Sequence, residues 1–135
     1  MWSLMGYSTG AFCAVKLLFL HPQLFDNAAG LGGYYQPLTD HTTGNLFHGS
    51  KIRYDENSPL WLYGRRGLAL GHRLLLVSGE QDTDSWSETQ KMLQATRGNP
   101  AVSSLTFPTG GHNYRNYRNS MPQVLRWLDQ GHAFG

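Results

Sequence analysis

A serine in a glycine-bounded turn is the first residue of this sequence that could perform covalent chemistry. Ser8 is the central residue of segment 6–10, G-Y-S-T-G, which fits the pattern G-x-S-x-G. In that pattern the serine occupies a strained strand-to-helix turn, and its hydroxyl projects where a substrate can reach it. We therefore predict that Ser8 is a nucleophile and that the backbone N–H of Thr9 binds the resulting oxyanion. The alternative is a glycine-rich turn whose serine caps the helix.

A serine nucleophile needs a base, and His112 is the first candidate. It lies in the sequence Gly-Gly-His-Asn of residues 110–113, after an expected strand and before the last expected helix. In hydrolases with this serine turn, the histidine follows the serine and the acid in chain order. The alternative is a surface histidine bonded to backbone. His41 and His48 could line a pocket, and the remaining histidines are weaker candidates: His21, His72 and His132.

The base needs an acid that orients it, and three carboxylates follow one strongly apolar segment. Residues 79–84 read G-E-Q-D-T-D. A carboxylate here could accept a hydrogen bond from the second imidazole nitrogen and stabilise the imidazolium. Asp82 is our first choice, with Asp84 and then Glu80 as alternatives. These acids could instead cap the following helix, where negative charge meets the helix dipole.

Apolar and polar segments alternate around these residues in the manner of an α/β fold. The alternation predicts parallel strands joined by helices. Residues 34–71 are irregular and form an excursion from the sheet, with short helices near 44–51 and 58–62. We expect a single partial domain over 1–135, with strands at 2–5, 27–31, 73–78 and 102–107 and helices at 11–20, 85–97 and 114–130, the last perturbed by Pro122.

The composition excludes several classes of function. With 40% hydrophobic and 15% charged residues, the chain has enough apolar side chains for a core. The net charge is +2 and the arginines are scattered, so we expect no nucleic-acid partner. The apolar run 11–20 is too short to span a bilayer, and the first residues lack the features of a secretory signal. Cys13 lies in this run and is expected to be buried.

Cofactors are not expected. A metal site built from His112 and nearby carboxylates is a weak hypothesis, because no ligand pair has helical i, i+4 spacing in a credible context.

The motifs resemble those of an esterase family of the α/β-hydrolase fold that includes esterase D, feruloyl esterases and antigen 85 mycolyltransferases. The likeness is strongest to actinobacterial members. The resemblance implies Ser8 as nucleophile, His112 as base and Asp82 as acid. In the mycolyltransferases the acid falls further along the loop, which keeps Asp84 open. The matching stretches are residues 3–10, 21–25, 55–61, 77–82 and 110–113.

The resemblance implies a serine-dependent carboxylic ester hydrolase that acts on a small-molecule ester through an acyl-enzyme. Acyl transfer to a sugar hydroxyl by the same triad is an alternative. Many family members act outside the cytoplasm, while this sequence leaves the location unknown.

Family members carry the serine turn much further from their first residue. We therefore expect the C-terminal half of an α/β-hydrolase fold, with about four parallel strands and flanking helices. The loop that donates a second oxyanion N–H would belong to the other half, which makes a catalytically incompetent fragment a further alternative. Strand 2–5 would form an exposed apolar edge through which the chain could self-associate.

Overall fold

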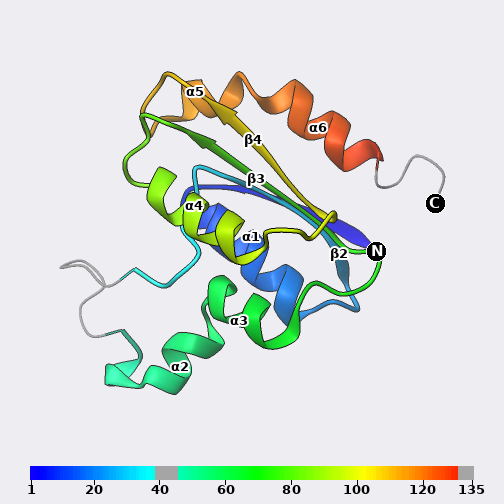
Figure 1. Ribbon diagram of the computed structural model, residues 1–135, viewed down its shortest axis with the longest axis vertical. Coiled ribbons are helices and arrows are strands. Elements are labelled where there is room, and N and C mark those ends of the chain that lie inside the picture. Colours follow the sequence, from blue (N-terminus) through cyan, green and yellow to red (C-terminus); the bar gives the residue numbers. More distant parts are fainter. Residues whose placement is uncertain (39–45, 131–135) are drawn as a thin grey trace.

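A four-stranded parallel sheet forms the centre of the protein (Figure 1). The computed structural model describes residues 1–38 and 46–130. The strands lie in sequence order, and every neighbouring pair is parallel. The predicted α/β fold with parallel strands is confirmed. The strands are β1 (Trp2–Tyr7), β2 (Phe25–Leu31), β3 (Arg73–Gly79) and β4 (Val102–Phe107).

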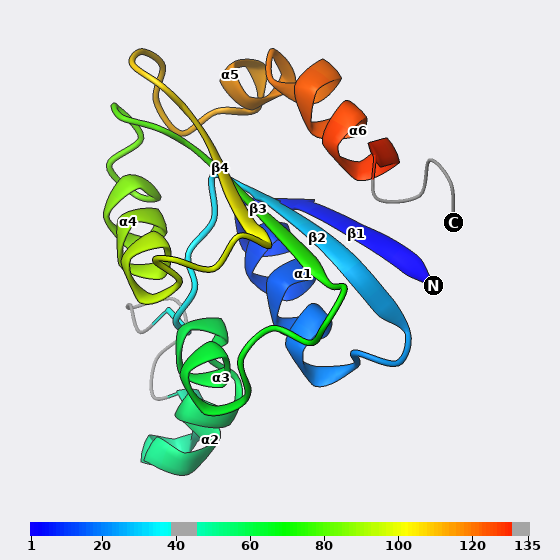
Figure 2. The same ribbon diagram turned by 45° about the vertical axis from the view of Figure 1, so that its right-hand side comes forward.

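Helices cover both faces of the sheet (Figure 2). On one face lie α1 (Thr9–Leu20), α3 (Pro59–Arg66) and α4 (Trp86–Ala95), and on the other lie α5 (Tyr114–Arg118) and α6 (Met121–Gln130). Strand β3 contributes side chains to the cores on both faces of the sheet, because successive side chains of a strand point to opposite faces. Leu74 and Leu76 join the core under α1, α3 and α4, whereas Leu75 and Val77 join the core under α5 and α6. This explains the nearly unbroken apolar run in β3.

Small residues in β2 allow α1 to pack closely on the sheet. Ala28 and Gly30 are buried at its centre on the face that α1 covers. A Cβ on Gly30 would lie 2.7 Å from the Tyr35 hydroxyl and 3.3 Å from a methyl of Val15. The poor strand propensity of alanine and glycine is therefore overridden by packing between helix and sheet.

The excursion contains η1 (Leu46–Gly49), α2 (Lys51–Glu56) and α3. Ser58 caps α3 and also ties it to the loop after β2, since its hydroxyl donates to the carbonyl of Tyr35 (3.2 Å). The short helix predicted near 58–62 is present. The helix predicted near 44–51 and His41 fall partly or wholly outside the described residues, and His48 is exposed.

Cys13 is exposed, so the prediction that it is buried is wrong. Cys13 lies in α1, which carries apolar residues on nearly all sides. Which of them are covered depends only on how the helix is rotated about its own axis relative to the sheet. The covered positions recur at three- and four-residue spacing, and Cys13 falls between them. They are Ala11, Ala14, Val15, Leu18 and Phe19.

The single helix predicted over 114–130 is instead two helices. A helix running through Pro122 would lose a hydrogen bond to the carbonyl of Arg118 and place the proline ring against it. The helix ends just before that point, and Asn119 and Ser120 separate α5 from α6. The Ser120 carbonyl then accepts the N–H groups of Gln123 (3.1 Å) and Val124 (3.0 Å) to start α6. Pro122 thus sits in a first turn, where proline is tolerated.

Strand β1 forms one edge of the sheet in the part of the chain that the structure describes. It pairs only with β2, and Trp2 and Met5 are 75% and 43% exposed. Self-association along this edge stays a prediction. Among residues 1–38 and 46–130, no helix has the length and apolarity needed to cross a membrane.

Candidate active site

Ser8 lies in a strained turn between β1 and α1. Its backbone has φ 58° and ψ −119°, a region that non-glycine residues occupy only when their surroundings fix them, at a cost of about 1–3 kcal/mol. Here the Ser8 N–H donates to the carbonyl of Leu31 in β2 (2.9 Å), and the Ser8 carbonyl accepts the N–H groups of Ala11 (2.9 Å) and Phe12 (3.3 Å). The strain fits the predicted nucleophile turn.

Only one of the two glycines around Ser8 is needed for the close approach of strand and helix. A Cβ on Gly6 would overlap the carbonyl group of Gly10 and lie 2.7 Å from the N atom of Ala11. A Cβ on Gly10 would have nothing within 4 Å. The turn therefore requires glycine at position 6, whereas position 10 has room for a side chain.

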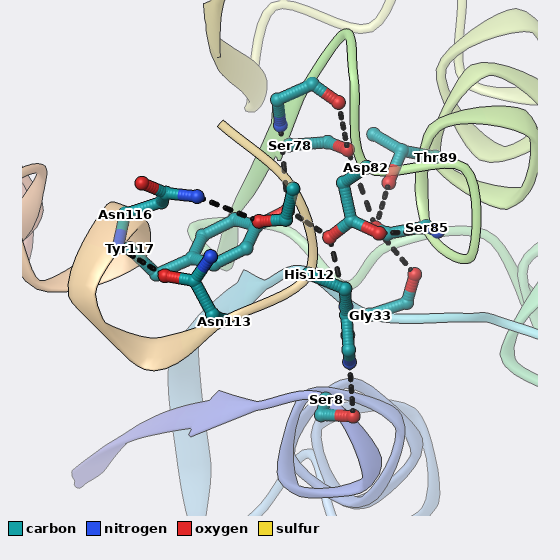
Figure 3. Close-up of polar contacts among 12 residues, drawn as sticks. Ser8, Gly33, Ser78, Asp82, Ser85, Thr89, His112, Asn113, Asn116 and Tyr117 are labelled. Carbon is teal, nitrogen blue, oxygen red and sulfur yellow. Dashed lines mark hydrogen bonds and ion pairs between the residues drawn. The ribbon is translucent and has the colours of Figure 1, made fainter. Parts of the chain in front are cut away.

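Three predicted residues meet at the carboxyl ends of the strands (Figure 3). The Oγ of Ser8 lies 2.9 Å from Nε2 of His112, and Nδ1 of His112 lies 2.8 Å from Oδ2 of Asp82. An ionised carboxylate only accepts hydrogen bonds, which assigns the imidazole proton to Nδ1 and leaves Nε2 to accept from the Ser8 hydroxyl. This geometry allows proton transfer from Ser8 to His112.

The structure brings Asp82, and neither Glu80 nor Asp84, into hydrogen bonding with the imidazole. The Asp82 side chain is fully buried, whereas Glu80 and Asp84 are exposed. Asp82 also fulfils the alternative helix-capping function, because its Oδ1 accepts the N–H of Ser85 at the start of α4 (3.1 Å). One carboxylate thus contacts the histidine through one oxygen and the helix start through the other.

Among the described residues, Asp82, Asp84 and His112 form a group that could hold a cation. Each offers one ligand atom, and these atoms lie within 4.8 Å of one another. Two of the three residues already hydrogen-bond to each other, so the arrangement is accounted for by a histidine oriented by a carboxylate.

Two tyrosines contact these residues, and sequence reasoning missed both. The ring of Tyr7 stacks on the imidazole of His112, with centroids 5.3 Å apart and planes at 22°. The hydroxyl of Tyr117 donates to Oδ2 of Asp82. Burial and this hydrogen bond raise the pKa of Tyr117 to about 12, and burial together with the Asp82 charge raises the pKa of Tyr7. Tyr7 adjoins Ser8 in the sequence, whereas Tyr117 is visible there only as an apolar position of the last helix.

Thr9 lies at the first position of α1, beside Ser8. N–H groups in the first turn of a helix have no acceptor within the helix, so they are available to an anion. The Thr9 hydroxyl accepts a hydrogen bond from Tyr34 (3.1 Å), and the Tyr34 ring stacks on Phe12 with centroids 5.1 Å apart. These contacts fix the helix start, while the oxyanion-binding function of Thr9 stays a prediction.

Together, the parallel sheet, its helices and its solved neighbours define an α/β-hydrolase fold. The predicted resemblance to serine hydrolases of this fold is confirmed. The chain belongs to the prolyl oligopeptidase family, whose model matches residues 2–132.

Solved structures and a curated relative resemble the chain over part of their length. An S-formylglutathione hydrolase from Agrobacterium tumefaciens has a TM-score of 0.80 and 14% identity, covering 98% of this chain and 49% of that one. A substrate-bound, fluorophosphonate-binding serine hydrolase of Staphylococcus aureus has a TM-score of 0.75 and 17% identity, covering 93% and 53%. An uncharacterized protein of Corynebacterium glutamicum is 23% identical over 94% of this chain and 32% of its own length. The chain thus spans about half of these solved structures and a third of that relative.

Proposed function

We propose that this chain carries the catalytic residues of a serine hydrolase that cleaves carboxylic esters through an acyl-enzyme. The observation that carries the proposal is the continuous hydrogen-bonded arrangement from Ser8 Oγ to His112 Nε2 (2.9 Å) and from His112 Nδ1 to Asp82 Oδ2 (2.8 Å). Nucleophile, base and orienting acid are the three groups that acyl transfer to serine requires.

In the proposed mechanism Ser8 Oγ attacks the ester carbonyl while His112 Nε2 takes its proton. Asp82 stabilises the imidazolium, and the N–H of Thr9 donates to the oxyanion. The imidazolium then protonates the leaving alcohol, which departs and leaves an acylated Ser8. Water deprotonated by His112 attacks this acyl group and releases the acid and free Ser8. In such sites, removal of one hydrogen-bond donor to the oxyanion lowers turnover by about 100- to 1000-fold.

A second candidate is hydrolysis of a peptide bond. The name of the matching family, the prolyl oligopeptidase family, favours this candidate. The covalent steps on Ser8 would be the same, and His112 would protonate an amine instead of an alcohol. Amines are poorer leaving groups, so the two candidates are separated by comparing p-nitrophenyl butyrate with a proline-containing dipeptide p-nitroanilide.

The test is labelling of the purified protein with a fluorophosphonate, followed by mass spectrometry of the labelled peptide. We expect one label on Ser8 and none on Ser8→Ala. Ser87→Ala is the matched control, because Ser87 is an exposed serine on α4, and it should label like the unaltered protein. A folded protein that does not label, or a Ser8→Ala variant that still labels, would contradict the proposal.

Ester hydrolysis is then measured on the same samples. Serine-dependent turnover of p-nitrophenyl butyrate supports the esterase proposal. Turnover of the dipeptide anilide alone would favour the peptidase candidate.

A further inference from the structure

The fully buried carboxylate of Asp82 has donors on both of its oxygens. Oδ1 accepts the N–H of Ser85 (3.1 Å). Oδ2 accepts from Nδ1 of His112 (2.8 Å) and from the hydroxyl of Tyr117. The donors come from the start of α4, the loop before α5, and α5 itself. A buried charged group is stable only when such bonds compensate its lost hydration.

Tyr117 connects this carboxylate to the end of β3. Its hydroxyl donates to Asp82 and accepts the N–H of Gly79 (3.3 Å). Gly79 is the last residue of β3, three positions before Asp82. The tyrosine hydroxyl therefore bridges the strand end and the acid across the turn that carries Asp82 toward His112.

We propose that Tyr117 is a positioning residue that holds Asp82 Oδ2 against His112 Nδ1 and so sets the reactivity of Ser8. This inference rests on the proposed function. Tyr117 is 1% exposed, so it acts through Asp82 and has no contact with substrate. Because burial and the bond to Asp82 keep the hydroxyl protonated, Tyr117 remains a donor throughout the neutral pH range.

The ring of Tyr117 has a separate function in packing. It lies against Gly32, where a Cβ would come within 2.7 Å of Cζ, and its centroid is 5.4 Å from those of Tyr7 and Phe107. A phenylalanine would keep these ring contacts and remove only the hydroxyl. Tyr117→Phe therefore separates the positioning function from packing.

The matched control is Tyr63→Phe. The Tyr63 hydroxyl accepts a hydrogen bond from Asn99 (3.1 Å), and its ring packs in the core on the opposite face of the sheet. This substitution removes a tyrosine hydroxyl and one hydrogen bond without touching Asp82. Any general effect of losing such a bond is thus measured in the same fold.

Two readouts are taken on each folded variant: the rate of fluorophosphonate labelling against probe concentration, and the proton NMR resonance of His112 Nδ1–H. For Tyr117→Phe we expect about a tenfold lower maximal labelling rate, since bonds to charged groups are the strong ones. The half-saturating probe concentration should stay unchanged and the Nδ1–H resonance should move. Tyr63→Phe should leave all three quantities unchanged.

Tyr117→Phe with the maximal rate and the resonance of the unaltered protein would overturn the inference. If Tyr117→Phe does not fold, 3-fluorotyrosine at position 117 keeps ring and hydroxyl while strengthening the donor. The resonance must then move, and an unmoved resonance again overturns the inference.

The two proposals fail in different ways. If Ser8 in the unaltered protein does not label, the proposed function fails whatever Tyr117 does. If Ser8 labels and Tyr117→Phe changes neither readout, only the positioning inference fails.

Discussion

Replacing Gly6 with alanine should disrupt the turn that carries Ser8, because strand β1 and helix α1 touch at this point. The added Cβ would overlap the carbonyl carbon and oxygen of Gly10 and lie 2.7 Å from the Ala11 nitrogen. All of these atoms belong to the main chain of the first turn of α1, so no side-chain rotation relieves the overlap. Overpacking that side chains can partly relieve costs about 1–3 kcal/mol. We therefore expect Gly6→Ala to lower the free energy of unfolding by about 3 kcal/mol or more.

Gly10→Ala is the matched control for this prediction. Position 10 is helical and open, with nothing within 4 Å of an added Cβ. Alanine there should stabilise the protein by about 0.5–1 kcal/mol through its higher helix propensity. Urea unfolding followed by tryptophan fluorescence measures both variants, and labelling of Ser8 measures the turn itself. Equal unfolding midpoints for Gly6→Ala and the unaltered protein would refute the steric reasoning.

Three further predictions test other contacts. Asp82→Asn should lower the labelling rate of Ser8 by about 1000-fold or more, because an amide supports the wrong imidazole tautomer. Asp84→Asn should stay within about threefold, since that carboxylate is exposed to water and the imidazole hydrogen-bonds to Asp82 instead. Because the Tyr117 pKa rises from 10.0 to about 12 on folding, its stabilising contribution is complete below about pH 10 and is lost as the pH rises toward 12. Tyr117→Phe should therefore flatten the fall in unfolding free energy over this same pH range, measured in urea, by up to about 1.4 kcal/mol per pH unit. Arg73→Met should destabilise the fold by about 1–2 kcal/mol in the same assay, because the Arg73 guanidinium lies 4.0 Å from the Trp127 ring centroid and donates to the Trp127 carbonyl (3.0 Å).

Features encoded in short segments could be predicted from the sequence. Ser8 and His112 stand in motifs whose strand and helix context is visible within a few residues. The strand β4 has the predicted bounds, and β3 ends one residue later than predicted. The sequence could rank Asp82 above Asp84 but could not decide between them, because the decision depends on the turn after β3. In that turn the Asp82 N–H donates to Gly79 (3.1 Å) and sends the side chain inward.

Features that depend on contacts between distant segments could not be predicted. The orientation of α1 on the sheet, which exposes Cys13, is one example. The bond from Tyr117 to Asp82 joins residues 35 positions apart in the chain, and a tyrosine among apolar helix positions looks like an ordinary core residue. The Tyr117 hydroxyl contacts the candidate site only because the turn after β3 places the Asp82 carboxylate beside it.

The three residues of the candidate site are not held in place equally firmly, because Ser8 follows the edge strand β1. Ser8 continues directly from β1, which has a strand on one side only in the described residues. His112 follows the other edge strand, β4, but it is tied to Asp82 after the central strand β3, and Ser85 and Tyr117 also bind this carboxylate. Edge strands open locally more readily than central ones, because fewer hydrogen bonds and buried contacts hold them. Fraying of β1 would carry Ser8 away from Nε2 while the imidazole–carboxylate pair stays assembled. We therefore expect the reactivity of Ser8 to report on a local opening equilibrium and, under mild denaturation, to decline before the central sheet melts.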